Sequence, residues 1–194
     1  MFDSEVLASR MYAVCVAVAR LMHITLLFLL FSIPLITMGA SLTALIATIR
    51  QPEFIVFKTF WKVFKENFFR SCIVMIFTVF TLMFLGQARA FTVGLPAGNI
   101  IYFFILSFLV VYNLNAYLLV SMLKKSNLTF FRQVFFFTIG TFYKGFFIPL
   151  ITAGLAIILP IIGGIPLLLM SLSIALSIYI KMIRNDLEVI KEYL

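Results

Sequence analysis

The sequence predicts an all-α membrane protein that crosses the bilayer several times. Of its 194 residues, 64% are hydrophobic and only 11% are charged, and the mean hydropathy is +1.18. Ordinary soluble domains contain about 45–50% apolar residues, so a soluble fold could not bury this much apolar surface. The apolar segments are continuous runs of Leu, Ile, Phe and Val, unlike the alternating pattern of barrel strands. Because lipid permits only helices and closed barrels as spanning structures, a helical bundle is predicted.

A bundle of about six helices, forming a single domain over residues 1–194, follows from the apolar segments. The predicted spans are 11–32, 35–49, 69–85, 100–123, 146–162 and 165–180. The second span is the doubtful one. At about 1.5 Å per residue it reaches only about 22 Å, which is less than a hydrocarbon core of about 30 Å. Whether it crosses the bilayer completely stays open at this point.

The first two spans are separated by the stretch FSIPLITMGASLTAL. Pro34 lacks a backbone N–H and disfavours helix in the residue before it, so the first helix is expected to end near Ser32. Gly39, together with Thr37 and Ser41, would then supply a tight turn and a hydroxyl cap for a new helix. The alternative is one long helix kinked at Pro34, which membrane helices tolerate.

The basic residues predict the orientation of the chain. If the short second span crosses, both termini are cytoplasmic and every Lys and Arg except Arg89 lies on that side, as the positive-inside rule expects. If it does not cross, Arg10 and Arg20 change sides. We therefore expect a multi-pass protein of the cell membrane with both termini in the cytoplasm. The same bias explains the net charge of +8, so membrane lipids and no nucleic acid are the expected contacts.

Residues 54–68 predict a helix that lies in the cytoplasmic interface. Aromatic side chains recur at helical spacing on one face, and lysines occupy another. The residues concerned are Phe60, Trp61, Phe64, Lys65, Asn67 and Phe68. The segment at 130–147 has a similar pattern with weaker polarity, and FKENFF matches FYKGFF in register. This predicts a duplicated unit in which both segments face the cytoplasm.

Residues 181–194 predict an amphipathic cytoplasmic helix that continues the last span. Ile183, Leu187, Ile190 and Leu194 repeat at four-, three- and four-residue spacing, and charged residues occupy the other faces. The apolar stripe requires a cover. Lipid headgroups, the helix at 54–68 and a partner subunit are the three candidates.

The turn and the aromatic helix together carry a family resemblance. SIPLITMGASLTAL followed by FKTFWKVFKENFFRSCIVMIF resembles the YesL family of bacterial membrane proteins, also catalogued as domain of unknown function 624. Its members show a Pro-x-x-Thr-x-Gly-Ala-Ser turn and then a Phe/Lys-rich stretch ending in Lys-x-Asn-Phe. The matching positions here are Pro34, Thr37, Gly39, Ala40 and Ser41, then Phe60, Phe64, Lys65, Asn67 and Phe68. A Trp frequent in the family after this stretch is missing.

The resemblance implies a setting rather than an activity. The family has no assigned reaction, and its genes commonly lie beside those of carbohydrate ABC importers and glycan-degrading enzymes in Gram-positive bacteria. Permease subunits of such an importer are therefore the implied partners.

The residues give no sign of catalysis. All seven carboxylates lie outside the predicted spans, where they cannot form an acid–base pair at membrane depth. His23 has no Cys, Asp or Glu nearby, and no zinc, nucleotide-binding or serine-nucleophile motif is present. We therefore expect no catalytic residue, no metal and no cofactor, and the chain is not predicted to be an enzyme.

Polar residues inside the predicted spans form two groups. Arg20 and His23 lie three residues apart on the first span, where an Arg anchored at the interface competes with an ion or ligand path as the interpretation. Asn113 and Tyr117 share one face of the fourth span, with Asn115 between them. Hydrogen bonding between helices is the expected role of this second group.

Two functions from different classes remain. The first is a non-catalytic accessory subunit that packs against a carbohydrate ABC importer, with contacts marked by small residues. These small residues are Gly39, Ala40, Ser41, Ala44 and Ala47, with Gly154, Gly163 and Gly164 near the last spans. The alternative is a small independent channel or carrier whose polar path runs through Arg20, His23 and Asn113.

Overall fold

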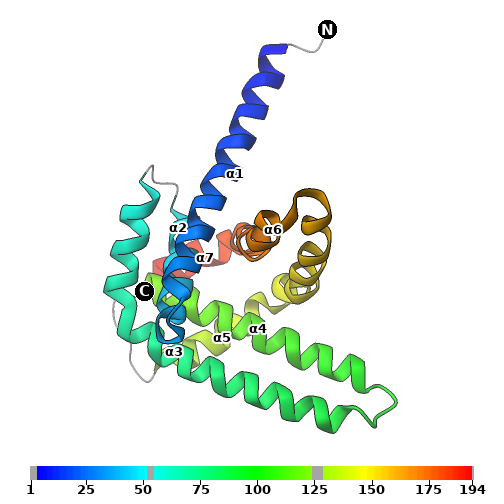
Figure 1. Cartoon of the computed structure of the whole chain (residues 1–194). Helices are drawn as coiled ribbons and strands as arrows, with labels where there is room; N and C mark the ends of the chain where they lie inside the picture. Colours follow the sequence, from blue (N-terminus) through cyan, green and yellow to red (C-terminus); the bar gives the residue numbers. More distant parts are fainter. Residues whose placement is uncertain (1–3, 52–54, 124–128, 194) are drawn as a thin grey trace.

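The computed structural model describes residues 4–51, 55–123 and 129–193, and this part of the chain is helical, with no strand among the described residues. The elements are α1 (Ser4–Ser32), the 3₁₀ turn η1 (Leu35–Thr37), α2 (Met38–Arg50), α3 (Val56–Thr92), α4 (Gly98–Met122), α5 (Thr129–Gly145), α6 (Ile148–Met182) and α7 (Arg184–Tyr193). Figure 1 shows α1 projecting from the other helices, with α3 and α4 forming a long antiparallel hairpin. The predicted all-α membrane fold is confirmed.

The helices differ in their ability to cross a bilayer. Arg10–Ser32, α3 and α4 are each long and apolar enough to do so. Helix α5 and the Ile148–Ile161 part of α6 qualify only as a pair bent by 50°, and α2 and Met170–Met182 are shorter apolar helices. By length and composition, three helices among the described residues are long enough for full spans, or four if the bent pair is one span; α2 is the short helix that the sequence predicted.

The helical hairpin at Pro34 forms as predicted, but the predicted cap is wrong. Helix α1 ends at Ser32 and α2 starts at Met38 after a 3₁₀ turn. Thr37 occupies the N-cap position of α2 without making a side-chain cap bond. Its hydroxyl instead donates back to the carbonyl oxygens of Phe31 and Pro34, the latter at 2.7 Å. The hydroxyl therefore contacts one of the last carbonyls of α1, that of Phe31, and the turn carbonyl of Pro34, which also accepts the backbone N–H of Thr37.

The predicted interfacial helix at 54–68 and the span at 69–85 are one helix, α3. No Pro or Gly interrupts the chain between Val56 and Leu85, and backbone groups in an apolar environment keep their helical hydrogen bonds. Figure 1 shows that α3 changes direction along its length, so its two parts still run differently. The helix end predicted between residues 68 and 69 is therefore absent, because α3 continues through this point and bends along its length.

The two spans predicted at 146–162 and 165–180 are also a single helix, α6. Gly163, Gly164 and Pro166 lie inside it, and membrane helices tolerate such residues because neighbouring groups satisfy the freed backbone atoms. Figure 1 shows α6 changing direction between its gold and orange parts. The side chains of 162–169 lie outside the described set, so the role predicted for Gly163 and Gly164 does too.

The proposed duplication fails at the matched hexapeptides. FKENFF lies inside the continuous helix α3, whereas FYKGFF contains the end of α5 at Gly145. A Cβ on Gly145 would lie 2.7 Å from Cγ2 of Val111. This glycine therefore permits close contact between α5 and α4, a constraint that the first hexapeptide does not share.

The C-terminal amphipathic helix is present but does not continue α6. A turn at Ile183 separates α6 from α7. Ile183 and Leu187 are buried in the core of the bundle, so the protein itself covers this part of the stripe. Lys144 of α5 holds Asp186 of α7 by an ion pair of 2.6 Å. The side chains of Ile190 and Leu194 lie outside the described residues.

Helix α2 forms the centre of the bundle, and its small residues serve internal packing. Gly39, Ala40, Ser41, Ala44 and Ala47 are all buried. A Cβ on Gly39 would lie 2.7 Å from the backbone oxygen of Ser71 on α3. Small residues allow such close approach of helices. These small residues of α2 therefore serve contacts within the bundle and are buried away from any partner.

Candidate functional site

Arg20 connects α1 to the end of α2. Its guanidinium donates hydrogen bonds to the carbonyl oxygens of Thr48, at 2.9 Å, and of Gln51. These carbonyls belong to the C-terminal end of α2, where backbone oxygens lack helical partners and the helix dipole favours a cation. Arg20 is half-buried and acts as a capping group. This capping role was not among the interpretations that the sequence offered for Arg20, and the interface anchor and the ion path stay predictions.

His23 is not brought together with Arg20. It is exposed on α1 and lines a shallow apolar depression with Met22, Leu26 and Leu30. Among the described residues, no group of three or more His, Cys, Asp or Glu side chains could hold a metal ion. His23 therefore stands apart from the polar groups of the bundle.

Asn113 and Tyr117 connect α4 to α3 through two threonines. The amide oxygen of Asn113 accepts a hydrogen bond from the Thr78 hydroxyl at 2.8 Å, and its amide nitrogen donates to the Thr81 hydroxyl at 3.0 Å. The hydroxyl of Tyr117 lies 2.9 Å from that of Thr78. The predicted interhelical hydrogen bonding is thus present in the geometry.

Asn115 connects three helices from the opposite face of α4. Its amide nitrogen donates to the hydroxyls of Thr138 at 3.2 Å and Thr141 at 3.1 Å, both on α5. Its amide oxygen accepts a hydrogen bond from Tyr179 of α6 at 2.7 Å. All four side chains are buried. Sequence spacing separated Asn115 from Asn113 but gave no sign of its partners on α5 and α6.

The aromatic face of α3 packs inside the protein. The ring of Phe31 on α1 lies 5.6 Å from Phe60, 5.3 Å from Trp61 and 5.2 Å from Phe64, measured between ring centroids. Phe68 continues the row at 5.8 Å from Phe64. Aromatic pairs at these distances stabilise packing beyond their buried area. The prediction that this face lies in the lipid interface is therefore wrong for Phe60 and Phe64, which are buried.

Among the polar residues of the family motif, Ser41 joins α1 to α2, whereas Asn67 and Lys65 make contacts within α3. The hydroxyl of Ser41 lies 2.6 Å from that of Ser32, which joins the two helices that meet at the exposed Pro34 turn. Asn67 is buried and donates to the carbonyl oxygen of Val63 at 3.1 Å. Lys65 lies over the Trp61 ring at 4.7 Å. These contacts are structural, and none presents a reactive group to a ligand.

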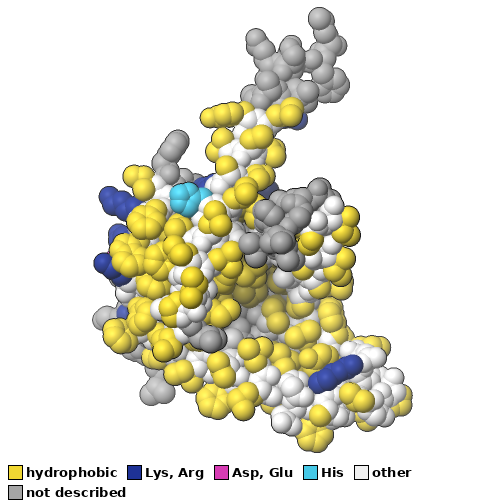
Figure 2. Space-filling view, in the orientation of Figure 1, with side chains coloured by type: hydrophobic (Ala, Val, Ile, Leu, Met, Phe, Trp, Pro, Cys, Tyr) yellow, Lys and Arg dark blue, Asp and Glu magenta, His cyan; other side chains and the backbone are white. Residues whose placement is uncertain are grey.

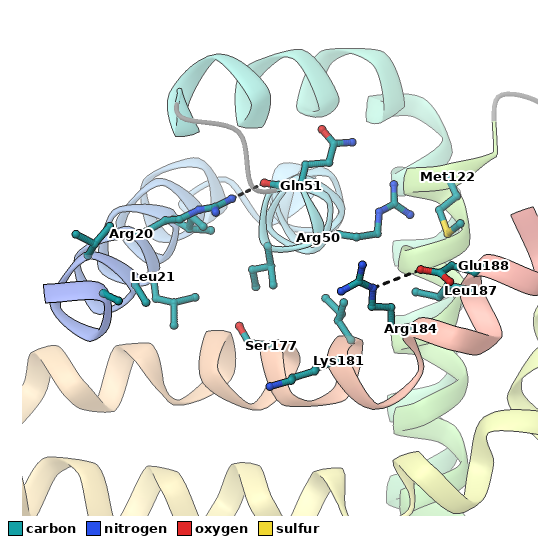
Figure 3. A pocket seen from close by; sticks show the side chains of 16 residues that line it. Arg20, Leu21, Arg50, Gln51, Met122, Ser177, Lys181, Arg184, Leu187 and Glu188 are labelled. Carbon is teal, nitrogen blue, oxygen red and sulfur yellow. Dashed lines mark hydrogen bonds and ion pairs between the residues drawn. The ribbon is translucent and has the colours of Figure 1, made fainter. Parts of the chain in front are cut away.

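A basic pocket lies where α1, α2, α6 and α7 meet, with a volume of about 950 Å³. It is lined by four cationic side chains, Arg20, Arg50, Lys181 and Arg184, and one carboxylate, Glu188. Figure 3 shows Arg50 and Arg184 extending into the same space from different helices. From the sequence, these residues indicated the orientation of the chain, and Arg20 was also a candidate for an interface anchor or an ion path. For Arg50, Lys181 and Arg184, the position at or near a helix end was the signal that could have grouped them; Arg20 lies in the middle of α1.

The first turns of α1 form an exposed arm, which we define as residues 10–19. Every side chain of the arm is exposed, and Tyr12 reaches 73%. Figure 2 shows this apolar arm standing out from the body of the protein. The arm is rich in small residues, with Ala13, Cys15, Ala17 and Ala19 among them. In membranes such residues mark surfaces where helices pack closely.

Comparison with known proteins yields one match. Residues 21–87 match the model of the family described as a protein of unknown function, DUF624. The resemblance predicted from the turn and the aromatic helix is confirmed over these residues. No curated protein and no solved structure matches the chain. The matched segment covers the end of α1, α2 and most of α3, which is the part of the bundle held by the motif residues.

Proposed function

We propose that this chain is a non-catalytic accessory subunit that packs against permease subunits of a carbohydrate ABC importer in the bacterial cell membrane. The observation that carries the proposal is the use of the intramembrane polar groups. Asn113, Asn115 and Tyr117 are engaged with other helices, and Arg20 caps α2. The side chains of Asn113, Asn115 and Tyr117 are satisfied in this way, so they contribute to packing and do not leave a polar path for a solute.

The choice of partner comes from the family resemblance over residues 21–87. The gene setting implied by that resemblance is a carbohydrate importer. The orientation we propose, with both termini in the cytoplasm, rests on the distribution of Lys and Arg. Together these considerations support a protein that adds helices to an assembly and performs no chemistry of its own.

The arm of α1 is the contact surface that we propose. Tyr12, Cys15 and Ala19 of the arm follow three- and four-residue spacing and therefore share one face of α1, and Met22, just beyond the arm, continues that face. All four are exposed. The residues of α1 that line the basic pocket occupy a different face, so a partner helix can pack on the arm without closing the pocket.

Copurification tests this proposal. The full chain, tagged at its C-terminus, is purified in detergent from cells that express the importer, and the permease subunits retained are quantified. We expect a fixed ratio of permease to chain. Ala19→Phe should lower that ratio because it enlarges the contact face. Ala90→Phe, at an exposed position near the end of α3, is the matched control.

A different result would favour the channel or carrier. A chain that purifies alone from those cells, and that moves a solute by itself in proteoliposomes, would overturn the accessory role. Equal loss of permease with Ala19→Phe and Ala90→Phe would place the contact elsewhere than on the arm.

A further inference from the structure

We infer that the basic pocket binds the phosphate headgroup of an anionic phospholipid, with an acyl chain lying along α1. This inference does not depend on the proposed accessory function. The pocket brings together Arg20, Arg50, Lys181 and Arg184 from four helices, and Glu188 is its one lining carboxylate. Glu188 pairs with Arg184 at 3.4 Å, so the remaining cations face the cavity without an acidic lining partner.

The depth of these cations in the membrane favours a bound anion. Helix α2 has 13 residues, which corresponds to about 20 Å and is too short for a hydrocarbon core of about 30 Å. Its end meets Arg20, and α1 continues beyond this level through the apolar arm. If Ser32 lies at one membrane surface, the cations therefore lie below the other. Charged groups at such depth are costly unless an opposite charge or water accompanies them.

Two guanidinium nitrogens, one on Arg20 and one on Arg50, have no hydrogen-bond acceptor in the part of the chain that the structure describes. Among the described residues, Nε of Arg20 and Nη1 of Arg50 are buried and have no hydrogen-bond partner. Buried donors without a partner carry a desolvation cost, so such groups normally have one. A phosphate supplies several strong acceptor oxygens, and the planar guanidinium matches its geometry. The pocket thus offers donors of the kind that phosphate satisfies.

The walls of the pocket favour a lipid over a free phosphate ion. On the α1 side it is lined by apolar residues at helical spacing, among them Ala13, Val16, Ala17, Leu21 and Ile24. From Ala13 to Ile24 this wall is about 16 Å long. An inorganic ion would leave that apolar wall without a partner, whereas an acyl chain covers it. Basic pockets between membrane helices are known sites for anionic lipid headgroups.

Lipid titration with native mass spectrometry tests the inference. The full chain is purified in detergent, stripped of lipid and titrated with phosphatidylglycerol or with phosphatidylcholine. We expect retention of phosphatidylglycerol and little retention of phosphatidylcholine. Each basic residue near an anionic surface contributes roughly a fivefold factor in affinity, so Arg50→Gln combined with Lys181→Gln should weaken binding about 25-fold.

The matched control removes the same charges elsewhere. Lys62→Gln combined with Arg132→Gln changes two exposed cations that do not line the pocket, and it should leave the affinity unchanged.

Equal weakening by both double variants would overturn the site. Thermal stabilisation by inorganic phosphate equal to that by phosphatidylglycerol would overturn the lipid as its occupant. If the pocket variant does not fold, Lys181→Gln alone should still weaken binding about fivefold, and an unchanged affinity would contradict the inference.

Discussion

Tyr179 of α6 donates its hydroxyl hydrogen to the amide oxygen of Asn115 of α4 over 2.7 Å, inside the bundle. The nitrogen of the same amide donates to Thr138 and Thr141 of α5. One side chain therefore fixes the relative positions of three helices that are otherwise packed largely through apolar side chains. Because apolar helix surfaces slide on one another with little preference, such a polar junction specifies register.

Replacing Asn115 should cost more stability than replacing any one of its partners. Asn115→Leu leaves the Tyr179 hydroxyl without its acceptor in a buried site, so we expect a loss of about 1–3 kcal/mol. Thr138→Val removes one bond of several and should cost about 0.6 kcal/mol. Thermal unfolding in detergent measures both. In a double-mutant cycle, Tyr179→Phe should recover part of the loss caused by Asn115→Leu, and strict additivity would contradict the junction.

Gly39 should tolerate no added carbon. In Gly39→Ala the new Cβ would lie 2.7 Å from the Ser71 oxygen and 3.0 Å from Cβ of Met75, and we expect a destabilisation of about 1–3 kcal/mol. The control is Gly140→Ala in α5, where no atom lies within 4 Å of the new Cβ. That change should be neutral or slightly stabilising because Ala favours helix. Equal melting temperatures for the two variants would count against the close packing of α2 on α3.

Only arginine at position 20 should give the protein its full stability. Arg20→Gln removes the charge that caps α2, and we expect a loss of about 1.5–3 kcal/mol, the range for hydrogen bonds to charged groups. Arg20→Lys should recover only part of it, since an ammonium does not reproduce the fork of donors. Thermal unfolding is again the measurement. His23→Gln, one turn away and exposed, should have no effect, and a loss equal to that of Arg20→Gln would contradict the capping role.

The membrane orientation can be tested with single cysteines. In a chain with Cys15 and Cys72 replaced by serine, a cysteine at Ile36, which is 72% exposed in the α1–α2 turn, should react with an impermeant maleimide in intact cells. A cysteine at Ser4 should react only after permeabilisation, because the positive-inside bias places the N-terminus in the cytoplasm. Labelling at Ser4 in intact cells would reverse the proposed orientation.

The local features of the fold were the ones the sequence could predict. The helix end at Ser32 and the restart before Gly39 follow from the chemistry of proline and glycine, which acts within a few residues. The continuity of α3 was missed because the change from a charged to an apolar stretch, with no Pro or Gly between Val56 and Leu85, does not end a helix. The continuity of α6 was missed because neighbouring helices decide whether a breaker residue ends a helix or only bends it.

The candidate site was predictable only in part. The spacing of Asn113 and Tyr117 placed them on one face, and the structure supplies Thr78 on α3 as their common partner. The basic pocket was missed because Arg50 and Arg184 are distant in sequence and meet only through packing. Likewise, the aromatic pattern of α3 indicated an apolar face without telling whether lipid or protein covers it.

Photo-cross-linking from the arm of α1 tests the central claim most directly. A photoreactive phenylalanine analogue is placed at Tyr12 or, as the control, at Phe91 near the end of α3; these side chains are 73% and 80% exposed. Both chains are expressed with the importer and irradiated in intact cells. The accessory role predicts a cross-link to a permease subunit from position 12 and none from position 91. No cross-link from position 12, or equal cross-links from both positions, in cells where the chain is inserted beside an assembled importer, would contradict it.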